Sequence, residues 1–174
     1  MRRLITIITV LMTATMLTGC IGNPYKAGIK NLEKGEYSEA AEEFKEAIED
    51  EKHLADSYRG LGIALWEEKD YEGAFSAFEQ AISEGTEVTA TIYNLMGNCL
   101  MELQKYESAA EYYELAIARE DISEELKREA RYNLIAAYEY AGKVDKAKET
   151  VKEYIADYPD DEEVLREADF LETR

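Results

Sequence analysis

The strongest constraint on the fold is a pattern of apolar and small residues that returns every 34 to 35 positions. In its central copy, two stretches with helical spacing are separated by Lys69 and Asp70, and the pattern residues are Tyr58, Leu61, Gly62, Leu65, Tyr71, Ala74, Phe78 and Ala81. Apolar residues three and four positions apart form one face of an amphipathic helix. The recurrence therefore predicts a series of helical hairpins and argues against a sheet.

Each copy has a small residue in its first helix, Gly62 in the central one, and a small, aromatic, small series in its second helix. A helix–turn–helix unit with this pattern and period resembles the tetratricopeptide repeat. The resemblance implies an all-α fold, a right-handed α-solenoid of about four helix pairs plus a C-terminal capping helix. The expected domain covers residues 24–174, with repeats at about 24–52, 54–86, 88–121 and 122–159 and the cap helix at 161–172.

The fourth repeat departs from the family pattern. Ile135 and Tyr154 stand where the family prefers smaller residues, so looser or differently angled packing of this unit is expected. The unit also follows the third after 38 residues, and the four additional residues predict one further helical turn. The series from Asp121 to Glu124 has the form of a capping box, which predicts an early start of that helix.

The first twenty residues have the pattern of an export signal. Residues 1–3 are basic at two positions, and residues 4–17 form an apolar run that is too short to span a bilayer. The run ends in Leu17, Thr18, Gly19 and Cys20, which resembles the lipobox of bacterial lipoproteins. The resemblance implies a signal peptide at 1–19, a diacylglycerol on Cys20 and a short tether at 20–23. An ordinary signal or membrane anchor with a chance cysteine is the alternative.

Export with a lipid anchor would place the protein on the outer face of a bacterial cytoplasmic membrane, or in the outer membrane where the cell has one. Lipidation of Cys20 would leave Cys99 without a partner for a disulfide. Because Cys99 lies on the first helix of the third repeat, we expect it to be a small buried apolar residue. A reactive thiol is the alternative interpretation.

Charge and composition exclude several classes of function. The chain has 20 basic and 38 acidic residues, and binding to a polyanion requires basic residues, so we expect no nucleic-acid partner. A basic partner is compatible with this charge, as is a simply solvated surface. The single histidine, His53, offers no metal site or nucleophile relay, and adjacent pairs such as Glu42 and Glu43 do not face each other across a cleft. We therefore expect no cofactor and no enzymatic activity.

The first helices of such an array line its concave side, and this groove is the expected binding site. Aromatic and arginine side chains commonly anchor interfaces, and Asn94 and Asn98 are predicted to hydrogen-bond a peptide backbone. Alternatively, Ile29, Ile63 and Trp66 pack between neighbouring helices. The predicted groove residues are Tyr25, Ile29, Arg59, Ile63, Trp66, Asn94, Asn98, Met101, Tyr132, Asn133 and Tyr140.

The sequence thus favours a membrane-anchored scaffold or adaptor of the cell envelope that holds a partner peptide or helix in this groove. A clamp for a C-terminal carboxylate is disfavoured, because Tyr25 and Asn94 stand where relatives with such a clamp have lysines. The alternative is a self-associating structural lipoprotein whose groove forms a homo-oligomer interface.

Overall fold

The computed structural model describes residues 22–173, so the predicted signal peptide and Cys20 lie outside the described residues. Residues 22–173 form nine α-helices and no strand, which confirms the predicted all-α fold. None of these helices combines the length and the apolar character needed to cross a membrane. The helices are α1 (Pro24–Lys34), α2 (Tyr37–Glu49), α3 (Leu54–Glu67), α4 (Tyr71–Ser83), α5 (Ala90–Glu102), α6 (Tyr106–Ile117), α7 (Glu124–Tyr140), α8 (Val144–Asp157) and α9 (Glu162–Glu172).

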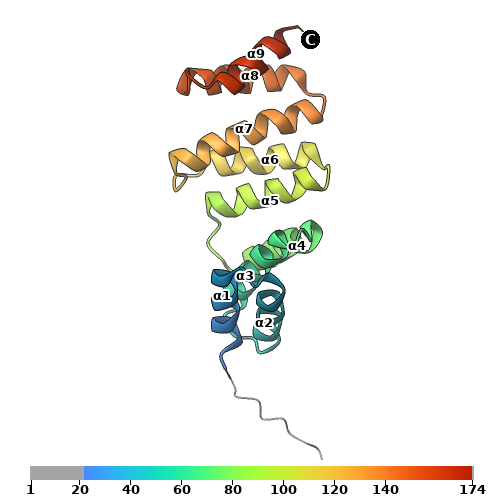
Figure 1. The fold of residues 1–174 in the computed structure, drawn as a ribbon, viewed down its shortest axis with the longest axis vertical. Coiled ribbons are helices and arrows are strands. Elements are labelled where there is room, and N and C mark those ends of the chain that lie inside the picture. Colours follow the sequence, from blue (N-terminus) through green and yellow to red (C-terminus); the bar gives the residue numbers. More distant parts are fainter. Residues whose placement is uncertain (1–21, 174) are drawn as a thin grey trace, which may run out of the picture.

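The helices stack along one axis in chain order, with α1 and α2 at one end and α9 at the other (Figure 1). Each helix packs against the next one in the chain, and α1 also contacts α3, as α5 contacts α7. The elements therefore form four hairpins, α1/α2, α3/α4, α5/α6 and α7/α8, followed by the single helix α9. This is the predicted α-solenoid with a terminal helix.

Local sequence signals explain where the helices begin and end. The Asn23 side chain caps α1 by accepting a hydrogen bond from the Lys26 amide over 3.1 Å. Gly35 ends this helix with φ of 75°, a left-handed conformation that glycine adopts without a side-chain clash.

The start of α7 differs from the prediction. Ser123, not Asp121, caps the helix, and its hydroxyl accepts a hydrogen bond from the Leu126 amide over 3.2 Å. The Asp121 carboxylate instead accepts from the Ala90 amide at the start of α5 and from Arg119. The predicted capping box is therefore wrong, because the neighbouring repeat offers Asp121 another unsatisfied helix N-terminus. The predicted additional turn is present, since α7 has 17 residues and α5 has 13.

The small residues of the repeat pattern make room for the rings of the second helices. A Cβ atom added at Gly62 would lie 2.7 Å from the Phe78 ring, and one added at Gly97 would lie 2.7 Å from Tyr113. The first hairpin differs because Phe44 lies against glycines of two helices, Gly28 of α1 and Gly60 of α3. Glycine therefore allows close helix contact both within a repeat and between the first two repeats.

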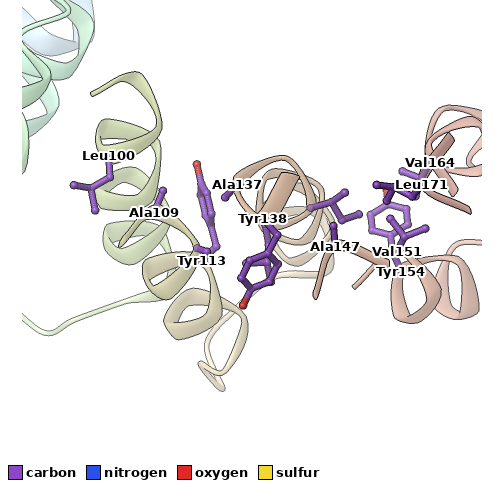
Figure 2. Packing of buried hydrophobic residues seen from close by; sticks show 13 residues of the cluster. Leu100, Ala109, Tyr113, Ala137, Tyr138, Ala147, Val151, Tyr154, Val164 and Leu171 are labelled. Carbon is purple, nitrogen blue, oxygen red and sulfur yellow. The ribbon is translucent and has the colours of Figure 1, made fainter. Parts of the chain in front are cut away.

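Buried side chains form a continuous core through the stack. One cluster spans α2 to α5 and another spans α5 to α9, and Phe75 and Tyr112 pack against both. Figure 2 shows the second cluster, in which Tyr113, Tyr138 and Tyr154 follow one another from α6 to α8. The rings of Phe75 and Tyr112 meet edge to face with centroids 5.5 Å apart, which ties α4 to α6 across the connection at 84–89.

The fourth hairpin shares a smaller backbone interface between its two helices than the three earlier ones, as the bulky Ile135 led us to expect. It is nevertheless filled, because Ile135 and Val151 are each only 3% exposed. In the third repeat the corresponding residues are Gly97 and Tyr113. The fourth repeat has thus exchanged a glycine and a ring for two branched aliphatic residues, which restores the packed volume.

Candidate functional site

The predicted groove residues lie on α1, α3, α5 and α7, and we call this surface the first-helix face. Hydrogen bonds join neighbouring first helices along it. Asn133 of α7 donates to Asn98 Oδ1 of α5 over 3.3 Å, and Asn94 of α5 donates to Glu129 Oε1 of α7 over 3.0 Å. Both pairs join residues 35 positions apart, and because the third and fourth repeats are offset by 38 residues, they connect non-equivalent positions of the two first helices.

Asn94 and the Oδ1 of Asn98, both predicted to hydrogen-bond a peptide, have hydrogen-bond partners within the chain. Asn94 is only 3% exposed, and its Nδ2 is occupied by Glu129. The Asn98 Oδ1 accepts from Asn133 and also from the Tyr113 hydroxyl, at 2.7 Å. These amides therefore help to align α5, α6 and α7.

In the first two repeats, several of the predicted groove residues pack against other side chains of the chain. Tyr25 stacks on His53 with ring centroids 4.6 Å apart, so the only histidine has a structural contact at the start of α3. Ile63 and Trp66 are half-buried against the core, and Trp66 lies 5.1 Å from the ring of Tyr71. These contacts agree with the packing interpretation for Ile63 and Trp66.

Other predicted residues remain accessible. Ile29 is 36% exposed and lies outside both core clusters, and Tyr132 and Tyr140 are 40% and 66% exposed. Arg59 is exposed and pairs with Asp56 of the same helix at 3.0 Å. Met101 is half-buried against the second core cluster. The exposed apolar surface of this face is therefore concentrated on α1 and α7.

A pocket between α7 and α9 extends the first-helix face beyond the predicted residues. It has a volume of about 350 Å³, and we call it the α7/α9 pocket. The Tyr132 hydroxyl donates to Glu163 of α9 over 2.7 Å at this site. Sequence analysis assigned α9 only a capping role and so missed most of this pocket. It is lined by Glu125, Arg128, Glu129, Tyr132, Tyr154, Asp161 and Glu163.

The pocket is strongly acidic. Arg128 is its only basic lining residue, and this side chain is already bound to Asp161 over 2.8 Å. An adjoining pocket of about 70 Å³ shares Tyr132 and Glu163 and adds the carboxylates of Glu139 and Glu167. The hydrogen bond to Glu163, burial and nearby carboxylates raise the pKa of Tyr132 to about 12, so its hydroxyl stays protonated at neutral pH.

Cys99 has the buried environment predicted for a small apolar residue. Its side chain is 0% exposed, and burial raises the pKa of its thiol to about 12. A thiolate is the reactive form of cysteine, so this environment suppresses reactivity. Within residues 22–173, no group of histidine, cysteine and carboxylate side chains has the geometry to hold a metal ion.

Comparison with known proteins agrees with this architecture. The profile of the tetratricopeptide repeat family matches residues 25–88 and 90–162. The TPR repeat-containing protein YsoA of Bacillus subtilis (strain 168) is 28% identical over 138 residues, which is 79% of this chain and 41% of YsoA. The chain thus spans about two fifths of the length of this relative.

Solved structures show the same fold. YrrB, described as a TPR protein with an unusual peptide-binding site, superposes with a TM-score of 0.72 at 20% identity, covering 85% of this chain and 74% of YrrB. A structure of MamA 41-end from Desulfovibrio magneticus RS-1 has a TM-score of 0.72 at 22% identity, covering 88% of this chain and 86% of that chain.

Proposed function

The chain belongs to the tetratricopeptide repeat family, and from that premise we propose that it is a membrane-anchored, non-enzymatic scaffold of the bacterial cell envelope. Its first-helix face holds a peptide or helix of a partner protein, and a diacylglycerol on Cys20 keeps the complex at the membrane. The fold itself is one that serves protein–protein interaction.

The observation that carries this proposal is the exposure of Ile29, Tyr132 and Tyr140 on the first-helix face. Contact with water is unfavourable for large apolar side chains, so their exposure on one face indicates a candidate interaction surface. Tyrosine is favoured at interfaces because its ring buries a large area and its hydroxyl keeps a hydrogen-bonding group. YrrB, which has the same fold, is described as having a peptide-binding site, and this supports peptide binding by the helical array.

The short tether supports a location of the first repeat close to the bilayer. Three residues separate Cys20 from Pro24, where α1 begins. Extended residues reach at most ~3.5 Å each, so three of them reach no farther than about 10 Å. A partner bound on α1 would therefore be held next to the lipid surface.

A cross-linked pull-down from membranes of the native host tests the proposal. The natural chain should recover a partner that is lost from the Ile29→Ser, Tyr132→Ser double variant. The chain should keep its helicity, since both side chains are partly exposed. This pair is preferable to Arg59 with Trp66, because Trp66 also packs against the core. Leu115→Ser is the matched control, because Leu115 is 45% exposed on a second helix, α6.

Three outcomes would count against parts of this function. If the double variant still captures the partner, the first-helix face is excluded as the binding site. Recovery of the protein alone would favour the self-associating alternative, with this face as the homo-oligomer interface. Unchanged membrane recovery of a Cys20→Ala chain would exclude the lipid anchor.

A further inference from the structure

The terminal helix α9 stands in the position of a first helix. Its cap Asp161 follows the α7 cap Ser123 by 38 residues, the offset between the third and fourth repeats. It packs against α8 at the end of the stack, as α7 packs against α6 (Figure 1). In the four hairpins, each first helix also packs against the second helix that follows it. Within the described residues, which end at 173, no second helix follows α9.

A pocket lies at the place where such a second helix would pack. It lies between α8 and α9 and has a volume of about 350 Å³, and we call it the α8/α9 pocket. Its lining residues Ile155 and Glu172 follow Ile117 and Leu134 by 38 positions. Ile117 and Leu134 line a pocket that α8 borders together with α6 and α7. The place that a second helix occupies in the fourth repeat is therefore open on α9.

The floor of the α8/α9 pocket is apolar. Val151 and Ile155 of α8 and Ala168 and Leu171 of α9 line it. Leu165 is 38% exposed and lies three positions before Ala168, on the same side of α9. Apolar side chains that gather at an open position in this way are typical of an interface.

The α8 rim of the pocket is basic. Lys148 and Lys152 lie one helical turn apart and line the pocket together with one acidic residue, Glu172. Neither lysine forms an ion pair within residues 22–173. In a chain with 20 basic and 38 acidic residues, this rim differs in charge from most of the surface. It therefore favours an acidic segment as the occupant.

Helix α9 itself has the chemistry that fits this pocket. It contains five acidic residues and one basic residue, Arg166, which pairs with Glu162 at 3.8 Å. Asp169 and Glu172 are exposed and lie four and seven positions after Leu165, beside it on the helix surface. The α9 of a second copy would therefore bring a leucine to the apolar floor and carboxylates to the two lysines.

We propose that the α8/α9 pocket binds α9 of a second copy of this chain, so that each α9 completes the last repeat of the other. The contact is isologous, because the same pocket and the same helix are used twice across a two-fold axis. The lining residues of the pocket belong to α8 and α9, so the first-helix face on α1, α3, α5 and α7 stays outside it. The inference thus goes beyond the proposed function and does not depend on it.

Co-purification of two differently tagged copies of the full, detergent-solubilised chain tests the proposal. The natural chain should carry the second copy with it. Lys148→Glu with Lys152→Glu in both copies should weaken the association at least about tenfold, because both symmetric contacts become repulsive. Pairing this variant with a copy that carries Asp169→Lys and Glu172→Lys should restore co-purification, since opposite charges then meet at both contacts. Restoration also shows that the two variants are folded.

Lys26→Glu with Lys30→Glu on α1 is the matched control. These lysines have the same spacing as the α8 pair and are exposed, so their reversal changes the net charge equally and leaves the pocket intact. Co-purification should survive in this control. It should also survive in Ile29→Ser, Tyr132→Ser, because both residues lie on the first-helix face.

Co-purification that persists when Lys148 and Lys152 are both reversed would overturn the proposal. Equal loss in the α1 control would also overturn it, because only the net charge would then matter. Loss in Ile29→Ser, Tyr132→Ser alone would move self-association to the first-helix face. A natural chain that is monomeric by light scattering and cross-links from position 165 to a different protein would assign the pocket to a foreign segment and reject the second copy.

Discussion

The Tyr154 hydroxyl donates a hydrogen bond to Asp161 Oδ2 over 2.8 Å and so joins the last repeat to the terminal helix. Arg128 binds both groups, since its Nε donates to the same hydroxyl over 3.0 Å and its NH2 group donates to Asp161. Asp161 also caps α9 through the amides of Glu163 and Val164. The large residue at position 154 and the longer α7, which places Arg128 one turn inside the helix, thus serve the same junction.

Replacing Tyr154 with phenylalanine should loosen this junction while keeping the buried ring. The loss of a buried hydroxyl with two partners is expected to cost about 1 kcal/mol of unfolding free energy. Amide hydrogen exchange in α9 should accelerate more than exchange in α3. Tyr140→Phe is the control, because Tyr140 is 66% exposed. Unchanged exchange in α9 would mean that the hydroxyl does not hold the helix.

The same junction should depend on pH. Hydrogen bonds from Tyr154 and Arg128 lower the pKa of Asp161 below its ordinary value. A lowered carboxyl pKa contributes stability above the unfolded-state pKa and loses it as pH falls through the folded-state pKa. In urea unfolding, the natural chain should therefore have a higher unfolding free energy than Asp161→Asn at neutral pH. This difference should shrink as the pH falls. A constant difference over this range would contradict the prediction.

Adding a methyl group at Gly60 should destabilise the contact between the first two repeats. A Cβ atom there would lie 2.3 Å from Cζ of Phe44, whose side chain is 1% exposed. Overpacking of this kind is expected to cost about 2 kcal/mol in chemical unfolding. Replacing the ring with a smaller side chain, Phe44→Leu, should recover part of the unfolding free energy lost at Gly60. A double-mutant cycle measures this recovery. Additive effects of the two substitutions would show that the clash is not the cause.

Cys99 should resist alkylation in the folded protein. In a Cys20→Ala chain it is the single thiol, and its raised pKa and complete burial predict labelling by iodoacetamide more than about a hundredfold slower than for a free thiol. Labelling should become rapid in denaturant. A cysteine placed at exposed Ser83 provides the reference rate. Fast labelling of the folded chain would favour the reactive alternative.

The repeat pattern was sufficient to predict the hairpins because one contact recurs in each of them. In this contact, a small residue of the first helix lies against a ring of the second helix. Gly62 and Gly97 are needed where Phe78 and Tyr113 approach the first helix, so the small and aromatic residues recur together. The cap at Asn23 was predictable for a similar reason, since it acts on an amide three residues away. Asp121 was not, because its partner lies 31 residues earlier in the chain.

The candidate site was less predictable because helical spacing identifies a face and not the neighbours of each side chain. Asn94 lies on the predicted face but is bound to Glu129, and Asn98 is bound to Asn133. Both pairs are 35 residues apart, whereas the two repeats are offset by 38 residues, so comparison of equivalent repeat positions does not reveal them. The sequence pattern assigned α9 only a capping role, so the contact of Glu163 with Tyr132 was missed.

Residue-specific photo-cross-linking tests the central claim most directly. A benzophenone amino acid would replace Ile29, Tyr132 or Leu115 in turn in the lipid-anchored protein, followed by irradiation of native membranes. The account predicts a cross-linked product with another protein from positions 29 and 132 and none from position 115 on α6. A product from position 115 alone would contradict binding on the first-helix face.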